Sequence, residues 1–292
     1  MEGHFDDELW GLAVSNSKHE FFTGGQDKLL MKWDITQKKC IEKKKLDGPI
    51  NCLDLSRNNQ LAVGMKNGVV NIFEGSNLKL VKFFHKHKNP DKDMISVVKF
   101  SPDGTRLAVA YAPPYSCIYV YDLNDPELKA KCLSGSPSRI NSIDFSRNGQ
   151  AIMINNTSYE ILFYDATSSQ QKKAMTASNF KGEEWATLTA RFSWATQGIW
   201  PPCSDGSDIN TVDRSNSKKY IATGDDFSKV KIFDNPACQE KQIYNSYKGH
   251  SSHITGVKWS FDDKYLISTG GLEKSIIQWT NTNEEEINYD YD

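Results

Sequence analysis

The sequence lacks the features that would place the chain in a membrane or make it helical. No apolar stretch approaches the roughly 20 residues that a spanning helix needs, and the amino terminus, MEGHFDDELW, lacks the basic and apolar segments of a signal peptide. Helical periodicity does not persist over any long stretch. We therefore expect no membrane partner and a fold built mainly from strands.

Motifs of catalysis and cofactor binding are also missing. The sequence has no Gly-x-x-x-x-Gly-Lys phosphate loop, no Gly-x-Ser-x-Gly elbow and no His-Glu-x-x-His pair. The acidic segment with Asp205, Asp208 and Asp213 lacks the alternating ligands and the terminal Glu of an EF-hand, which favours a structural turn over a calcium site. We expect no catalytic residue, no cofactor and no metal, and therefore not an enzyme.

Excess charge of one sign and paired cysteines are absent as well. The 35 basic and 37 acidic residues give a net charge of −2, which indicates no general affinity for nucleic acid or anionic membranes. The six cysteines form no Cys-x-x-Cys pair, which is typical of reduced thiols in a cytosolic protein. Aromatic residues make up 11% of the chain, enough for a packed sheet protein.

What the sequence does contain is a repeat. The first copy runs from Gly3-His4 to Trp33 and the last from Gly249-His250 to Trp279, and each places 29 positions between its His and its Trp. In the last copy, runs rich in branched and aromatic residues at Ile254–Trp259, Tyr265–Ser268 and Ser275–Trp279 are separated by polar turns. This layout predicts antiparallel strands joined by hairpins.

Four further copies share the same two signals. The first strand of each copy is expected at Leu9–Val14, Ile50–Leu55, Ile95–Phe100, Ile140–Phe145, Ile209–Asp213 and Ile254–Trp259. The third strand is expected to end in an aromatic and a polar residue, at Trp33-Asp34, Phe73-Glu74, Tyr121-Asp122, Tyr164-Asp165, Phe233-Asp234 and Trp279-Thr280. The aromatic residues are spaced by 40, 48, 43, 69 and 46 positions, so one interval is too long.

A period near 40 with aromatic–Asp endings resembles the WD-repeat family, which implies an all-β fold, a β-propeller. In that family a buried His, a Ser or Thr, a turn Asp and a Trp form a hydrogen-bonded tetrad. The corresponding residues here are His4, Thr23, Asp27 and Trp33 in the first repeat, and His250, Thr269 and Trp279 in the last, where Glu273 replaces the Asp. We expect six recognisable blades, with seven possible, in a single domain over residues 1–292.

The long interval contains an atypical insertion, residues 166–208, within one blade. It carries three of the seven tryptophans, Trp185, Trp194 and Trp200, so part of it must pack against the blades. We expect short strands at Trp185–Phe192 and Gly198–Trp200.

The insertion indicates which family of WD-repeat proteins the chain resembles. The segments from Glu184 to Thr187, from Gly198 to Pro201 and from Ser204 to Asn210 are similar to the atypical blade of the echinoderm microtubule-associated protein-like family. The similarity extends over essentially the whole chain. It implies the second of two joined propellers, an upstream propeller in the longer protein, and a place in the cytoplasm at the cytoskeleton.

This resemblance favours a non-catalytic scaffold whose protein partners are tubulin or microtubule-associated proteins. The alternatives are a WD-repeat adaptor in a signalling or ubiquitin-transfer complex and, third, an enzyme with a site in the propeller channel. Two basic segments and the insertion tryptophans are the candidate contact residues: Lys43, Lys44, Lys45, His85, Lys86, His87, Lys88, Trp185, Trp194 and Trp200.

The last repeat is expected to lack its outer strand. Residues 281–292 form an acidic tail that we expect to be mobile. We predict an incomplete last blade and a ring whose closure is imperfect or is supplied by the insertion.

Overall fold

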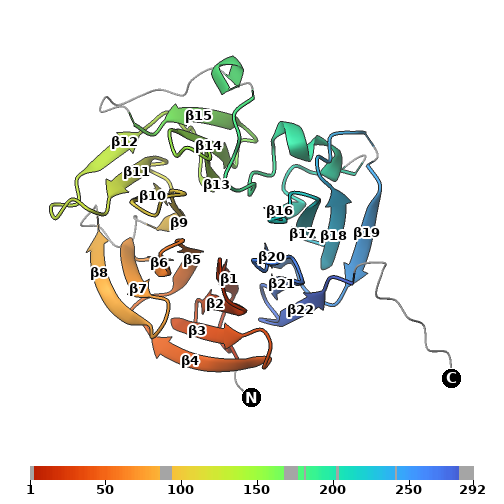
Figure 1. The fold of residues 1–292 in the computed structure, drawn as a ribbon, viewed down its shortest axis with the longest axis horizontal. Coiled ribbons are helices and arrows are strands. Elements are labelled where there is room, and N and C mark those ends of the chain that lie inside the picture. Colours follow the sequence, from red (N-terminus) through yellow and green to blue (C-terminus); the bar gives the residue numbers. More distant parts are fainter. Residues whose placement is uncertain are drawn as a thin grey trace.

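The computed structural model describes residues 3–85, 94–167, 177–180, 182–201, 204–240 and 242–282, and these form six antiparallel sheets arranged as the blades of a propeller (Figure 1). The expected six-bladed, all-β fold is therefore confirmed. Within each sheet the strands pair in sequence order.

Each blade begins with an inner strand at the centre of the ring and continues outward. Blade 1 contains β1 (Leu9–Val14), β2 (Glu20–Gly25), β3 (Leu29–Asp34) and β4 (Lys39–Lys45). Blade 2 contains β5 (Ile50–Leu55), β6 (Gln60–Met65), β7 (Val69–Glu74) and β8 (Lys79–His85). Blade 3 contains β9 (Ile95–Phe100), β10 (Arg106–Tyr111), β11 (Ile118–Asp122) and β12 (Ala130–Leu133).

The other three blades follow the same plan. Blade 4 contains β13 (Ile140–Phe145), β14 (Ala151–Asn156) and β15 (Ile161–Asp165). Blade 5 contains β16 (Ile209–Arg214), β17 (Tyr220–Asp225), β18 (Lys229–Asp234) and β19 (Tyr244–Lys248), and blade 6 contains β20 (Ile254–Trp259), β21 (Tyr265–Gly270) and β22 (Ile276–Thr280). The predicted aromatic–polar pairs are the last two residues of the third strand in all six blades.

The turn after each inner strand has the same construction. It opens with a buried serine, one of Ser15, Ser56, Ser101, Ser146, Ser215 and Ser260. In blade 4 the Ser146 hydroxyl accepts a hydrogen bond from the N–H of Ala151 at 2.8 Å. Gly149 follows with a φ of +72°, a conformation that glycine adopts without steric cost. The serine therefore fixes the register of the first hairpin.

The hydrophobic core consists of clusters that join neighbouring sheets. One cluster packs Phe22 and Leu30 of blade 1 against Leu61 and Phe73 of blade 2. A smaller one joins blade 1 to blade 6 through Phe21 and other residues. Because an isolated sheet of this size would expose one apolar face, packing against both neighbours is what stabilises each blade.

The ring closes directly between the first and last blades. Thr255 of β20 donates a hydrogen bond to the Leu9 carbonyl at 2.5 Å, and the Leu9 N–H donates to the Gly271 carbonyl at 3.2 Å. His19 and Asp262 add a 3.0 Å contact across the same junction. Blade 6 has three strands among the described residues. The predicted closure by the insertion is wrong, because residues of blades 1 and 6 themselves make the contacts at this junction. The rest of the predicted acidic tail, residues 283–292, lies outside the described residues.

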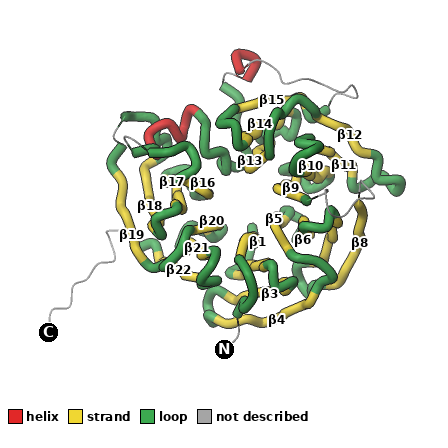
Figure 2. Tube along the Cα trace, turned by 180° about the vertical axis from the view of Figure 1, so that it is seen from behind, coloured by secondary structure: helices red, strands yellow, loops and turns green. Residues whose placement is uncertain are grey.

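The insertion lies at the junction between blades 4 and 5. Figure 2 shows its two 3-10 helices, η1 (Ala177–Phe180) and η2 (Trp194–Ile199), on this side of the ring. The prediction of strands at Trp185–Phe192 and Gly198–Trp200 is wrong: apart from one isolated bridge at Trp185, the described part of the insertion pairs with no strand. Its backbone N–H groups bond instead to single acceptors of both blades, such as the Asp144 carboxylate and the Ala237 carbonyl.

Among the described residues, no helix is long and apolar enough to cross a membrane.

Candidate interaction site in the central channel

The predicted tetrad of the first repeat is one chain of hydrogen bonds. Asp27 contacts His4 Nδ1 at 2.9 Å, His4 Nε2 lies 2.9 Å from the Thr23 hydroxyl, and Trp33 Nε1 donates to that hydroxyl at 2.8 Å. Burial disfavours the Asp27 carboxylate, but hydrogen bonds from His4 and from backbone N–H groups outweigh it and lower the pKa of Asp27. The tetrad therefore ties the chain entering blade 1 to strands β2 and β3.

In the last repeat, the prediction that Thr269 supplies the tetrad hydroxyl is wrong. His250 Nε2 lies 2.7 Å from Ser268 Oγ, and Trp279 Nε1 donates to the same oxygen at 2.8 Å. His250 Nδ1 contacts Glu273 at 2.8 Å, so the glutamate does occupy the place of the turn aspartate. Thr269 instead contacts Thr255 at 3.1 Å, on the channel side.

The reason for this error is a pair of compensating length changes. His250 precedes Ser268 by 18 positions, whereas His4 precedes Thr23 by 19. The segment from Ser268 to Trp279 is one residue longer than the segment from Thr23 to Trp33. The equal His-to-Trp spacing of the two repeats therefore concealed a one-residue shift, which moves a side chain to the opposite face of a strand.

The basic segments are placed differently from each other. Lys43, Lys44 and Lys45 lie on the outer strand β4, and Lys44 Nζ turns inward to donate to the Leu78 carbonyl of blade 2 at 2.8 Å. Lys43 and Lys45 are exposed. His85 ends the outer strand β8 and is exposed, while the remaining candidates, Lys86, His87 and Lys88, lie outside the described residues.

The three insertion tryptophans divide into two groups. Trp185 packs against Phe163 and Phe180, with ring centroids 5.9 and 6.5 Å away. Trp200 stacks on Phe192 at 4.9 Å. Trp194 is 66% exposed. Two of the three therefore anchor the insertion, and Trp194 remains the candidate contact residue among them.

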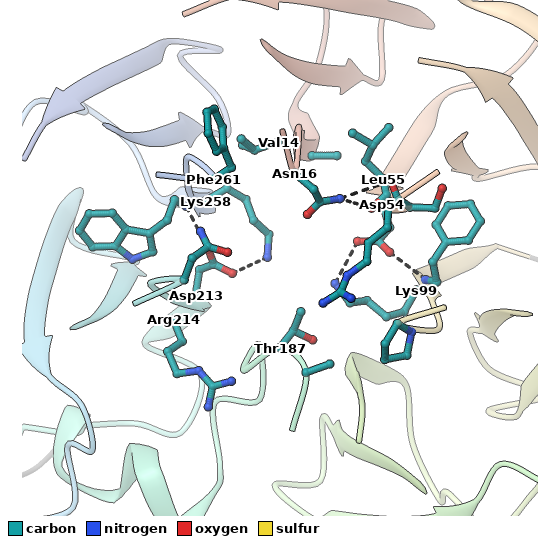
Figure 3. A pocket seen from close by; sticks show the side chains of 18 of the residues that line it. Val14, Asn16, Asp54, Leu55, Lys99, Thr187, Asp213, Arg214, Lys258 and Phe261 are labelled. Carbon is teal, nitrogen blue, oxygen red and sulfur yellow. Dashed lines mark hydrogen bonds and ion pairs between the residues drawn. The ribbon is translucent and has the colours of Figure 1, made fainter. Parts of the chain in front are cut away.

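A ring of charged residues on the inner strands surrounds the channel. Lys99 of blade 3 donates to Asp54 of blade 2 at 2.9 Å, and the Phe100 N–H donates to the same carboxylate at 2.8 Å. Lys258 and the Trp259 N–H of blade 6 bind Asp213 of blade 5 in the same way, at 2.7 and 3.0 Å (Figure 3). Burial disfavours the charge on Lys99, but the Asp54 carboxylate outweighs it and raises the pKa of Lys99.

Asp144 of blade 4 holds the equivalent place at the insertion. Its carboxylate is fully buried and accepts from the Thr187 hydroxyl at 2.6 Å and from the N–H groups of Thr189 and Ala190, each at 2.9 Å. Ala190 follows Asp144 by 46 positions, as Phe100 follows Asp54 and Trp259 follows Asp213. The insertion therefore takes the position that the inner strand of the next blade takes elsewhere.

Sequence reasoning missed this ring, although a signal was available. The ring residues occupy the fifth position of each inner strand: Ala13, Asp54, Lys99, Asp144, Asp213 and Lys258. Five of the six are charged, three aspartates and two lysines, and only Ala13 is not. An alignment of the six inner strands shows charged residues at the fifth position, whereas the alternation of apolar and polar residues within a single strand does not.

One end of the channel opens into a basic mouth, defined here by Arg57, Arg147, Arg214 and Lys218. The cavity at this end has a volume of about 340 Å³ and lies at the carboxyl ends of the inner strands (Figure 3). Its charged lining is six basic and two acidic side chains: Arg57, Lys99, Arg147, Arg214, Lys218, Lys258, Asp54 and Asp213. Since both aspartates bind lysines, the excess positive charge comes from the four residues of the basic mouth, two of which, Arg147 and Lys218, share the carboxylate of Glu184.

These four residues differ in how tightly they are held. Arg57 is exposed and has no hydrogen-bonding partner among the described residues. Arg147 and Lys218 both contact Glu184 of the insertion, and these bonds, Lys218 first, lower the pKa of Glu184 to about 2. Arg214 donates to the Trp185 carbonyl at 2.7 Å. The insertion thus orients three of the four cations around the opening.

The acidic segment with Asp205, Asp208 and Asp213 does not arrange its carboxylates around a common point. Asp205 accepts from the N–H and hydroxyl of Ser207 and from the Tyr159 hydroxyl, while Asp208 accepts from the Asp205 N–H. Asp213 is in the channel ring. In the part of the chain that the structure describes, no group of three or more His, Cys, Asp or Glu side chains could hold a metal ion.

Comparison with solved structures supports the fold. The chain superposes on a chain of the structure entitled "Crystal Structure of Mitotic Checkpoint Complex" with a TM-score of 0.71 at 14% identity, covering 93% of this chain and 86% of that one. At this identity the similarity shows a common fold and nothing further.

Sequence comparison is more specific. A family model described as "Echinoderm microtubule-associated protein second beta-propeller" matches residues 9–281. The chain is 38% identical to echinoderm microtubule-associated protein-like 1 of Rattus norvegicus over 95% of this chain and 34% of that protein. It is 36% identical to echinoderm microtubule-associated protein-like 2 of Mus musculus over 96% of this chain and 42% of that protein. It is 34% identical to the 77 kDa echinoderm microtubule-associated protein of Strongylocentrotus purpuratus, over 94% and 39%.

The chain therefore spans between about a third and two fifths of the length of these relatives. The matched family model describes the second propeller of such proteins. The chain belongs to the echinoderm microtubule-associated protein-like family.

Proposed function

We propose that this propeller is a non-catalytic interaction platform of a microtubule-associated protein and that its basic mouth contacts an acidic surface of tubulin or of a microtubule-linked partner. Such a role places it in the cytoplasm at the cytoskeleton, with an upstream propeller in the longer protein. The observation that carries the proposal is the basic mouth, whose four cations gather at one end of the channel.

Local charge, not net charge, supports this contact. The whole chain has a net charge of −2, which would not attract an acidic surface by itself. At physiological salt, charges act over only about 8 Å, so a partner at the basic mouth responds to the residues around it and not to the distant outer strands. Arg57, with no carboxylate partner among the described residues, is free to pair across an interface.

The bonding of the channel carboxylates supports a non-catalytic role. Asp54 and Asp213 each accept from a lysine and from a backbone N–H of the next blade. Asp144 accepts from the insertion in the same way. A general acid or base must be able to exchange a proton with a substrate, whereas these carboxylates are committed to joining blades.

Co-sedimentation with microtubules tests the proposal. A variant carrying Arg57→Glu and Arg147→Glu reverses two exposed cations of the basic mouth without altering the core. We expect it to bind at least about tenfold more weakly than the unmodified chain, with a loss that shrinks as salt is raised.

The matched control is Lys43→Glu with Lys45→Glu, which makes the same charge change on the exposed side of β4. Both variants should be compared in this chain and in a chain that also carries the upstream propeller. Equal microtubule binding by the mouth variant and the control would refute the role of the basic mouth. If neither chain sediments and a pull-down recovers only non-cytoskeletal subunits, the microtubule role itself fails.

A further inference from the structure

The opposite end of the channel holds a second cavity, of about 300 Å³. It lies at the amino ends of the inner strands, and the layer of Asp54, Lys99 and Lys258 that lines both cavities separates it from the basic mouth. Four of its five charged lining residues are basic, namely Lys99, Arg139, Arg191 and Lys258. The fifth is Asp54. Because the two lysines bind Asp54 and Asp213, Arg139 and Arg191 carry its excess charge.

A bulge at the start of the inner strands directs polar side chains into this cavity. In β13 the pairing with β14 passes from Ile140 to Ser142, so Asn141 is left unpaired in the ladder. The same bulge occurs in β5 and β20 at Asn51 and Thr255. Asn51 donates to the Ile95 carbonyl of the next blade at 2.7 Å, and Thr255 donates to the Leu9 carbonyl. At these two junctions the bulged residue therefore bonds the neighbouring blade.

Asn141 departs from that pattern. Both polar atoms of its side chain are buried, and neither has a hydrogen-bond partner among the described residues. The hydroxyl of the adjacent Ser142 is likewise buried and unpartnered, and Ser142 is only 4% exposed. The insertion replaces the next inner strand at this junction, so it supplies no carbonyl to Asn141. Buried polar groups without partners are uncommon and destabilise the folded state, which is a reason to look for a ligand.

Two arginines lie beside these groups. Arg139 precedes β13, and Arg191 is delivered by the insertion, where it donates to the Ile209 carbonyl at 2.6 Å. Burial lowers the pKa of both, to about 10 for Arg191, and the charge of Arg139 lowers the pKa of Arg191 further. The group that opposes this effect at Arg139 is Cys52, but burial raises the pKa of Cys52 to about 12, so its thiol offers no negative charge. Asp226 partly compensates Arg191 but is itself bound to Asn210.

We propose that Arg139, Arg191, Asn141 and Ser142 form a binding site for a small phosphate-bearing anion at this end of the channel. A phosphate group offers acceptors to both guanidinium groups and to the amide and the hydroxyl at once. The cavity volume is at the lower end of the range for small-molecule pockets, about 300–1,000 Å³, which fits a phosphate group or a small molecule that carries one. The site requires the insertion, since Arg191 belongs to it.

Calorimetric titration of the whole chain tests the site, with inorganic phosphate and a nucleoside diphosphate as separate probes at fixed ionic strength and chloride as the reference anion. We expect saturable binding of one equivalent. Arg139→Gln should weaken it at least tenfold, which corresponds to about 1.4 kcal/mol. Because the Arg139 guanidinium makes no hydrogen bond to the described residues, this substitution leaves no protein group unpaired. Tighter binding of the nucleoside diphosphate would identify the ligand as a phosphorylated small molecule, and equal affinities would identify it as free phosphate.

Lys79→Gln is the matched control, because it removes an exposed cation of the outer strand β8 that lines neither cavity. It should leave anion affinity unchanged. Asn141→Ala provides a second test, and it should weaken phosphate binding while raising the stability of the unliganded protein. The inference is overturned if the unmodified chain shows no saturable heat with millimolar phosphate, or if Arg139→Gln and Lys79→Gln bind the anion equally well.

Discussion

Two junctions between neighbouring parts of the ring supply hydrogen-bond donors of different kinds to an aspartate of the inner strand. Between blades 2 and 3, the carboxylate of Asp54 accepts from the side chain of Lys99 and from one backbone N–H. Between blades 4 and 5, the carboxylate of Asp144 accepts from hydroxyls and from two backbone N–H groups of the insertion. The acceptor is an aspartate at the fifth position of the inner strand in both cases.

The difference teaches what the insertion contributes. An ordinary junction places a regular inner strand beside its neighbour and satisfies the carboxylate with a lysine. The insertion has no inner strand to offer, so its backbone bends to present consecutive N–H groups to Asp144. This arrangement buries the carboxylate fully, whereas Asp54 remains partly exposed. Because the insertion replaces the next inner strand, Asn141 has no carbonyl to bond, whereas its counterparts Asn51 and Thr255 each bond one.

The largest expected effect is at Asp144. Replacing it with Ala removes the acceptor of the Thr189 and Ala190 N–H groups and of the Thr187 hydroxyl. We expect a loss of about 3–4 kcal/mol in the free energy of unfolding, because the two backbone N–H groups are held in place by the fold and have no other acceptor among the described residues. Urea unfolding monitored by tryptophan fluorescence measures the change.

Asp54→Ala is the companion variant, and it should cost about 2–3 kcal/mol because it leaves the Lys99 ammonium without its partner. Adding Lys99→Met should recover most of that loss. No second substitution recovers Asp144→Ala in this way, since two of its four donors are backbone N–H groups that a substitution cannot remove. Equal losses at both junctions, or full tolerance of Asp144→Ala, would contradict the distinction between them.

The tryptophans of the insertion should give an intermediate effect. Trp185→Ala removes a ring that packs against Phe163 and Phe180, so we expect a loss of about 2–3 kcal/mol. Trp194→Ala removes a ring that is 66% exposed and should change stability by less than about 0.5 kcal/mol. Thermal unfolding of the two variants measures the difference. Similar melting temperatures for both would show that the insertion does not depend on Trp185 for its attachment.

The smallest expected effect is a dependence of stability on pH, and it arises from the tetrad of the last repeat. Burial lowers the pKa of His250 below its ordinary value of 6.5, despite the opposing effect of Glu273. The unfolded chain therefore binds a proton at His250 more readily than the folded chain, so this contribution to stability is present above pH 6.5 and is lost as the pH falls through the folded pKa. The urea midpoint should fall between pH 7 and pH 5.5, above the range in which Asp27 and Glu273 titrate.

His250→Asn is the control for that measurement. It should lower stability at pH 7 and reduce the dependence on pH across the same window, because the titrating group is gone. An unchanged pH dependence in this variant would assign the effect to another group.

The inner strands, the ends of the third strands and the number of repeats could be predicted from the sequence because hairpins are local. The inner strands Ile50–Leu55, Ile95–Phe100 and Ile140–Phe145 have the predicted bounds, set by alternating apolar residues and by turns that open with a serine. The aromatic ends of the third strands were found for the same reason. Partners a few residues apart meet through turn chemistry, which the order of residues specifies.

Only the tertiary structure decided what happens between blades. The hydrogen bonds from Phe100 to Asp54 and from Ala190 to Asp144 join residues 46 positions apart, and nothing local distinguishes a regular strand from a bent insertion as the donor. The choice of Ser268 over Thr269 depended on one residue of turn length, which alters the face on which a side chain lies. The sequence by itself determined six hairpin units and their order. Packing of the ring determined which side chains meet in the channel, because these contacts form only when every blade is in place.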